Sequence, residues 1–98
     1  MAVLIDTPVW HFRGRRWSHL VSDVSHDELH AFVAAALEIP PRAFQGDHYD
    51  VPEELYDRAV AAGAEPVSCR ELLSRLLAAG LRVRKPRPAR TAPGSAAG

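Results

Sequence analysis

The sequence has one cysteine, one lysine and no long apolar run in its 98 residues. Because Cys69 is the only cysteine, no disulfide can form within the chain and no group of thiolates can bind zinc. No stretch approaches the ~20 apolar residues that a membrane span requires. The apolar residues 1–5 form a run far too short for a signal peptide. We therefore expect a cytoplasmic protein with no membrane partner.

The sequence also lacks an excess of charge of either sign. Lysine plus arginine and aspartate plus glutamate each number 12, so the formal net charge is zero. A neutral chain has no general attraction for nucleic acid or for a membrane surface. Arginine supplies nearly all of the basic residues and alanine is abundant, which is typical of GC-rich coding sequences. The arginine content alone therefore says little about phosphate binding.

Composition divides the chain into a folded part and a tail. Apolar residues make up 47% of the sequence, which is ordinary for a globular domain. From residue 85 onward, Pro, Arg, Ala, Gly and Ser dominate, a composition typical of disorder. We predict a single domain over residues 1–84 and a disordered tail over residues 85–98.

Four short stretches have strand character. Residues 2–6 form a continuous apolar run, typical of a strand buried on both faces, that ends at Asp6. In residues 17–23, alternation places Trp17, His19, Val21 and Asp23 on one face. Residues 64–67 fit an edge strand because they include a proline, and residues 81–84 fit a last edge strand.

Three helices are predicted between these strands. Ser25 and Glu28 form a capping box that opens a helix with an apolar stripe through residue 37. Residues 52–62 fit a second helix that begins at a proline. A second capping box at Ser68 opens a third helix, closed by a glycine at residue 80.

Strands that alternate with helices predict a small α/β domain. We expect a sheet of about four short strands, at least partly parallel, with three helices packed on it. Asp6, Asp23 and Asp50 lie at the predicted ends of strands or next to them, so they could meet on one rim of the sheet.

Residues 44–50 are the richest polar cluster in the chain. If this stretch is extended, Gly46, His48 and Asp50 share one face, while Asp47 and Tyr49 share the other. An imidazole and a carboxylate on one face can bind a metal, or act as a base and its orienting partner. The structural alternative is that Asp50 caps the following helix and His48 is a loop residue.

Two further features have open interpretations. His26 and His30 are one helical turn apart at the edge of the first apolar stripe, a spacing that suits two metal ligands or a half-buried histidine. Cys69 falls in the first turn of the third helix, and without a neighbouring partner in the sequence we interpret it as an inert thiol.

Residues 10–17 interleave aromatic and basic side chains around a glycine. Such a loop could stack bases and hold phosphates through Arg13, Arg15, Arg16 and Trp17. It could equally fold its aromatic rings onto the core while the arginines stay solvated.

Several segments together resemble a family of short bacterial and phage proteins, the domain-of-unknown-function family 4031. They are Val3-Leu4-Ile5-Asp6, Gly14-Arg15, His19-Leu20, Asp27-Glu28-Leu29-His30, Phe44-Gln45-Gly46-Asp47-His48-Tyr49-Asp50 and Ala62-Gly63-Ala64. The family often has a second aspartate directly after the first, where this chain has Thr7, which disfavours paired carboxylates at the first strand. The resemblance implies no particular activity.

Three classes of function remain. In the first, a divalent metal (zinc, manganese or iron) activates water for hydrolysis of a phosphoester or a similar small molecule. The candidate ligands are Asp6, His19, Asp23, His48 and Asp50, and the candidate acid–base groups are His48, Asp50 and His30. In the second, the protein is a binding module for nucleic acid or protein through residues 10–17. In the third, it is a partner subunit, which could be a homodimer joined at an exposed strand edge.

Overall fold

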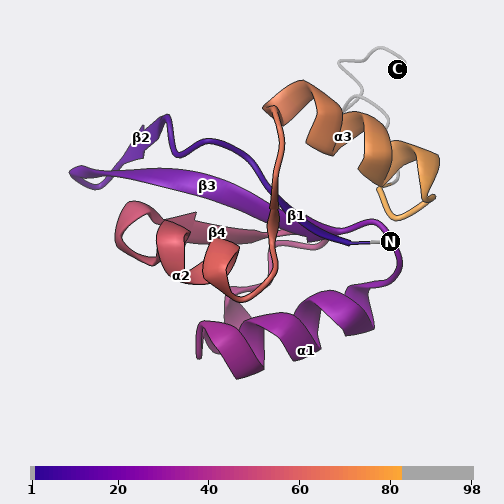
Figure 1. Ribbon diagram of the computed structural model, residues 1–98, viewed down its shortest axis with the longest axis horizontal. Coiled ribbons are helices and arrows are strands. Elements are labelled where there is room, and N and C mark those ends of the chain that lie inside the picture. Colours follow the sequence, from indigo (N-terminus) through magenta and orange to yellow (C-terminus); the bar gives the residue numbers. More distant parts are fainter. Residues whose placement is uncertain (1, 83–98) are drawn as a thin grey trace, which may run out of the picture.

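The computed structural model describes residues 2–82 as one mixed sheet with helices on both sides (Figure 1). The elements are β1 (Val3–Ile5), β2 (Trp10–Phe12), β3 (Arg15–Ser22), α1 (His26–Ala36), η1 (Pro41–Ala43), β4 (Tyr49–Pro52), η2 (Glu53–Leu55), α2 (Tyr56–Ala61), β5 (Glu65–Pro66) and α3 (Cys69–Ala78). The predicted α/β class and the partly parallel sheet are confirmed, with five strands rather than about four. The tail predicted over residues 85–98 lies outside the described residues.

The long strand β3 is the centre of the sheet. It pairs antiparallel with β1 through residues 20–22 and with β2 through residues 15–17. It also pairs antiparallel with β4 through residues 17–20, a segment that overlaps both of the others. β1 and β2 therefore follow one another along one edge of β3, while β4 occupies the opposite edge. Only β5 runs parallel to its neighbour, β1.

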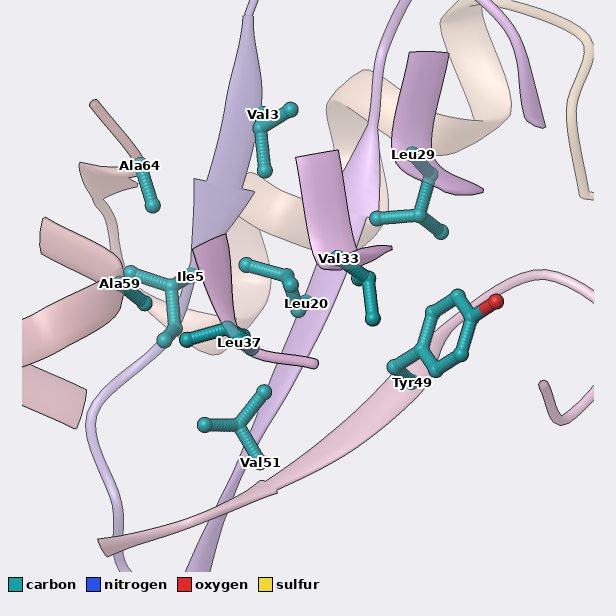
Figure 2. Packing of buried hydrophobic residues seen from close by; sticks show 10 residues of the cluster. All are labelled: Val3, Ile5, Leu20, Leu29, Val33, Leu37, Tyr49, Val51, Ala59 and Ala64. Carbon is teal, nitrogen blue, oxygen red and sulfur yellow. The ribbon is translucent and has the colours of Figure 1, made fainter. Parts of the chain in front are cut away.

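Two apolar cores lie on opposite sides of the sheet. The larger one packs Val3, Ile5 and Leu20 against α1 and α2, and Figure 2 shows its buried side chains. The smaller one packs Leu4 and Val21 against α3. Strand β1 therefore sends side chains into both cores, as its continuous apolar run predicts.

Side-chain caps set the N-terminal ends of α1 and α3. The hydroxyl of Ser25 accepts from the backbone N–H of Glu28, and the hydroxyl of Ser68 does the same for Glu71. The first capping box is only half formed, because the Glu28 carboxylate accepts from the hydroxyl of Ser22 instead of returning to Ser25. That carboxylate therefore ties the start of α1 to the end of β3.

The predicted helix over residues 52–62 is partly wrong. Residues 49–52 continue as strand β4, and regular helix begins only at Tyr56, after the single turn η2. The extended conformation is favoured because Tyr49 and Val51 alternate into the larger core while they pair with β3. Asp50 consequently lies within a strand and does not cap a helix.

The predicted loop over residues 10–17 is a β-hairpin. Strand β2 pairs with β3 around a two-residue turn in which both Arg13 and Gly14 have positive φ, 54° and 77°. Such turns match the twist of the flanking strands, and glycine adopts the conformation at little cost. Leu81 and Arg82 are not in a strand, and the rest of the strand predicted over residues 81–84 lies outside the described residues. Within residues 2–82, no helix has the length and apolar character to cross a membrane.

Candidate metal centre

His19 lies in the middle of β3 with an aspartate on each side. Asp6 follows β1, and its backbone N–H donates to the carbonyl of His19 over 3.2 Å. Asp50 is the residue of β4 that pairs with His19 across the other edge. Since side chains alternate along a strand, His19 points to the same side as Val21, the side that α3 covers. The register of three strands therefore places these groups side by side.

Asp6 fixes the orientation of the His19 ring. One carboxylate oxygen of this buried residue accepts from the backbone N–H of His19 over 2.6 Å, and the other is 2.8 Å from Nδ1 of its ring. Because an ionised carboxylate only accepts, Nδ1 carries the proton and Nε2 is left as the second ring nitrogen. The hydrogen bond to Asp6 raises the pKa of His19 above its ordinary value, although burial opposes this shift.

The carboxylate of Asp47 orients the ring of His48, as Asp6 orients the ring of His19. Its Nδ1 lies 2.7 Å from Oδ1 of Asp47, and its Nε2 lies 3.2 Å from Oδ1 of Asp50. Asp50 Oδ1 is buried and has no hydrogen-bond partner among the described residues, so the short approach to His48 is not a hydrogen bond. As predicted, His48 and Asp50 lie on one face of residues 44–50 and Tyr49 lies on the other. The prediction is wrong for Asp47, whose carboxylate contacts the ring of His48, and the stretch is not extended at Gly46, where φ is 93°.

These side chains converge on one point. One ligand atom each from His19, His48 and Asp50 lies within 4.8 Å of the other two. The two imidazole rings meet edge to face, with centroids 5.2 Å apart. A second group, formed by Asp6, His19 and Cys69, satisfies the same distance and shares His19. In that second group the Asp6 oxygens are already occupied by His19.

A cavity of about 160 Å³ adjoins the histidines. It lies between the sheet and α3, with His19, Val21, Asp47, His48, Cys69, Leu72, Leu73, Leu76 and Arg82 as its lining. Arg82 reaches in from beyond α3, and its Nε is 3.6 Å from Oδ2 of Asp47. The cavity therefore has an apolar wall of leucines and a polar wall that includes one guanidinium.

Cys69 has partners that the sequence did not indicate. As the first residue of α3, it lies close to Asp6 and His19, which are distant in the sequence. Burial and the neighbouring Asp6 raise the pKa of this thiol. A raised pKa keeps the sulfur protonated at neutral pH, which disfavours nucleophilic chemistry.

His30 does not join the candidate centre. It points from α1 into the opposite side of the sheet, where Nδ1 lies 2.7 Å from the hydroxyl of Tyr49 and the ring packs against Phe44. His26 packs against the same phenylalanine. The two histidines at helical spacing therefore border the larger core, and the sheet separates His30 from His48 and Asp50.

Asp23 also lies elsewhere. β1 and β3 are antiparallel, so the residue after β3 meets the start of β1 rather than its end. Asp23 accepts from the backbone N–H of Ala2 over 2.6 Å and from Arg75 over 2.7 Å. The expectation that Asp6, Asp23 and Asp50 meet on one rim is therefore wrong for Asp23.

The fold and this cluster define a small α/β protein with a histidine–carboxylate centre. Residues 3–79 match the family described as "Protein of unknown function (DUF4031)", and the chain belongs to that family. This confirms the resemblance found in the sequence. No curated protein and no solved structure matches the chain.

Proposed function

We propose that this protein binds a divalent metal through His19 Nε2, His48 Nε2 and Asp50 Oδ1 and uses it to hydrolyse a phosphoester. The observation that carries the proposal is the approach of His48 Nε2 to Asp50 Oδ1, a buried oxygen that accepts no hydrogen bond among residues 2–82. When Asp47 accepts the Nδ1 proton and Nε2 carries none, Nε2 and the carboxylate oxygen of Asp50 present lone pairs to each other. A bound cation turns this repulsion into coordination.

The distance between these two atoms supports the same proposal. Metal–nitrogen and metal–oxygen bonds of about 2.0–2.2 Å place two ligands of a tetrahedral site about 3.3–3.6 Å apart. The separation of 3.2 Å between His48 Nε2 and Asp50 Oδ1 is close to the lower end of this range. Two imidazoles and one carboxylate favour zinc, manganese or iron(II), and three protein ligands leave positions for water and substrate.

In this proposal Asp6 and Asp47 orient the ligands rather than bind the metal. A histidine that ligates through one nitrogen usually donates from the other to a carboxylate, which fixes its tautomer and ring position. Asp6 and Asp47 stand in that relation to His19 and His48. Asp6 thereby leaves the predicted ligand set and takes a positioning role.

The adjoining cavity offers space for a phosphoester substrate next to the proposed metal. A metal of this kind supplies a nucleophilic water at neutral pH. In the hydrolysis, the water would give up a proton as its oxygen bonds to phosphorus, the P–O ester bond would break, and the departing oxygen would take up a proton in its place. Arg82 lies on the polar wall of the cavity, where its guanidinium can hold a phosphoryl oxygen.

Elemental analysis of the purified, untagged protein tests the metal site, together with thermal melting in Zn²⁺, Mn²⁺ and Fe²⁺. We expect stoichiometric metal and a metal-dependent rise in melting temperature, both lost in His48→Ala and in Asp50→Asn. His11→Ala is the matched control, because it removes an exposed histidine on the other side of the sheet. Absence of metal in the wild type, or its retention in both ligand variants, would overturn the proposal.

Metal-free acid–base hydrolysis is the second candidate. The observation that favours it is the pair formed by Asp6 and His19, in which a buried carboxylate orients an imidazole that borders the cavity. Phosphoester hydrolysis that persists in EDTA and is lost in His19→Gln would favour this candidate over the metal.

A further inference from the structure

One side of the β2–β3 hairpin carries exposed aromatic rings and arginines. We call it the aromatic–arginine face, and it consists of Trp10, Phe12, Arg13, Arg15 and Trp17. Trp10 and Phe12 are 42% and 49% exposed, which is unusual for such large apolar side chains. In Figure 1 the hairpin extends away from α3, the helix that covers the other end of this side of the sheet.

The face is continuous with the candidate metal centre. Trp10 pairs with Trp17 in the register of the hairpin, and Trp17 and His19 are two residues apart on β3. These side chains therefore share one side of the sheet. The ring of Trp10 stacks on Phe12 with centroids 5.9 Å apart, and on His19 with centroids 5.5 Å apart. A column of nearly parallel rings thus leads from the hairpin to a proposed ligand of the metal.

Guanidinium groups accompany the rings. Arg13 lies over Phe12 at 5.2 Å, and Arg15 lies over Trp17 at 6.0 Å. Glu54 pairs with one nitrogen of Arg15 over 2.8 Å, and a guanidinium has further donors. Arg16 is not part of the face, because the alternation of β3 turns it to the other side of the sheet.

Trp17 has a structural role in this face. Its indole N–H donates to the carbonyl of Phe12 over 2.8 Å, which links the two strands of the hairpin. Phe12 and Arg13 are therefore the better positions at which to test binding, since neither contacts His19, His48 or Asp50 in the described contacts.

We propose that the aromatic–arginine face binds single-stranded nucleic acid and delivers a phosphodiester to the His19–His48–Asp50 centre. Exposed rings stack on bases with little regard to sequence, and arginines contact the phosphates between them. Single strands present both groups at once, whereas a duplex hides the faces of its bases. The delivery of the phosphodiester rests on the proposed function, but the binding itself does not.

Fluorescence anisotropy with labelled 12-mers of oligo(dU) and oligo(U) tests the binding, using the full chain in EDTA to prevent metal-dependent cleavage. Loss of one stacked base corresponds to about a 5- to 150-fold weaker affinity, which is the effect we expect for Phe12→Ala. Arg13→Gln should reduce the slope of log affinity against log salt by about 0.7, the contribution of one phosphate contact on a single strand. His11→Ala, between Trp10 and Phe12 but on the other side of β2, should bind as the wild type does.

A difference between the two oligonucleotides identifies RNA or DNA as the preferred ligand. Absence of binding to both at low salt, up to about 100 μM protein, would overturn the inference. Equal affinity of the wild type, Phe12→Ala and Arg13→Gln would also overturn it. A wild-type dimer that Phe12→Ala converts to monomer, without oligonucleotide binding, would assign the face to contact between two copies of the chain. Metal uptake is measured separately by elemental analysis. Oligonucleotide binding by a protein that takes up no metal would overturn the proposed function and the delivery that rests on it, but not the binding itself.

Discussion

Replacing Asp6 with asparagine removes one charge and almost no volume, yet under the proposed function it should weaken metal binding. The carboxylate accepts two hydrogen bonds from His19, one at the backbone and one at Nδ1 of the ring. An asparagine can keep the first through its amide oxygen, but its NH₂ group then faces Nδ1. That group can only donate, so Nδ1 must become the acceptor and the ring proton must move to Nε2. A protonated Nε2 cannot bind a metal.

The size of the effect follows from these contacts. Loss of a carboxylate partner of a metal-binding histidine typically weakens metal affinity by about 10- to 100-fold, which corresponds to about 1.4–2.7 kcal/mol. Because Asp6 is 3% exposed, loss of its charge-assisted hydrogen bonds should also reduce the free energy of unfolding by about 1–3 kcal/mol. The protein should still fold, so that the two effects are measured separately.

Competition with a chelating dye gives the metal affinity, urea unfolding gives the stability, and ¹⁵N NMR of the imidazole gives the tautomer of His19. Asp27→Asn is the control, because it makes the same change at an exposed position in the first turn of α1. A folded Asp6→Asn protein with wild-type metal affinity would refute the reasoning. Weakened affinity with the proton still on Nδ1 would refute the tautomer argument and leave only a structural role for Asp6.

Three further predictions concern the scaffold. Leu29→Ala should reduce the free energy of unfolding by about 2–5 kcal/mol, because the side chain is fully buried in the larger core, and leave metal stoichiometry unchanged. Burial disfavours the ionised form of Asp23, but its bonds to Ala2 and Arg75 outweigh this and lower its pKa. The stability lost in Asp23→Asn should therefore be complete above about pH 5 and vanish as the pH falls well below 4. Tyr49→Phe removes the partner of His30 and should cost about 0.5–1.5 kcal/mol without altering metal affinity.

Urea unfolding across pH, combined with the dye assay, checks all three. A cost below about 1 kcal/mol for Leu29→Ala would contradict its burial in the larger core, between α1 and the sheet. A constant difference between the wild type and Asp23→Asn down to pH 3 would contradict the lowered pKa. Weaker metal binding in a folded Tyr49→Phe protein would indicate that His30 acts on the centre despite its place on the opposite side of the sheet.

The elements that the sequence predicted well are those set by neighbouring residues. Ser25 and Ser68 begin α1 and α3 because the cap, the first turn and the apolar stripe are all local. The helix predicted from Pro52 begins too early, because Pro52, with its fixed φ, suits the end of strand β4 as well as a first helical turn. Strand β2 was missed because the turn uses Arg13 and Gly14 instead of the more typical Asn-Gly pair.

In the candidate centre, too, the contacts between residues close in the sequence were predictable and the contacts between distant residues were not. His48 and Asp50 are two residues apart, so their proximity was predictable from an extended stretch. The link from Asp6 to His19 required the antiparallel pairing of β1 with β3, which no local pattern reports. The same antiparallel pairing places Asp23 next to the start of β1, away from the candidate centre. The helical periodicity of α1 placed His30 at the edge of its apolar face. That periodicity does not indicate which side of the sheet α1 covers.

Strand register couples the core to the candidate centre. Tyr49 and Val51 of β4 are almost fully buried on the α1 side, so Asp50 between them must point to the α3 side, toward His19. A slip of one residue in this pairing would turn Asp50 into the core and expose the two apolar side chains. The hydrogen bond from Tyr49 to His30 further fixes the strand against α1. His30 therefore supports the centre without touching it, since the core that it borders holds Asp50 in position.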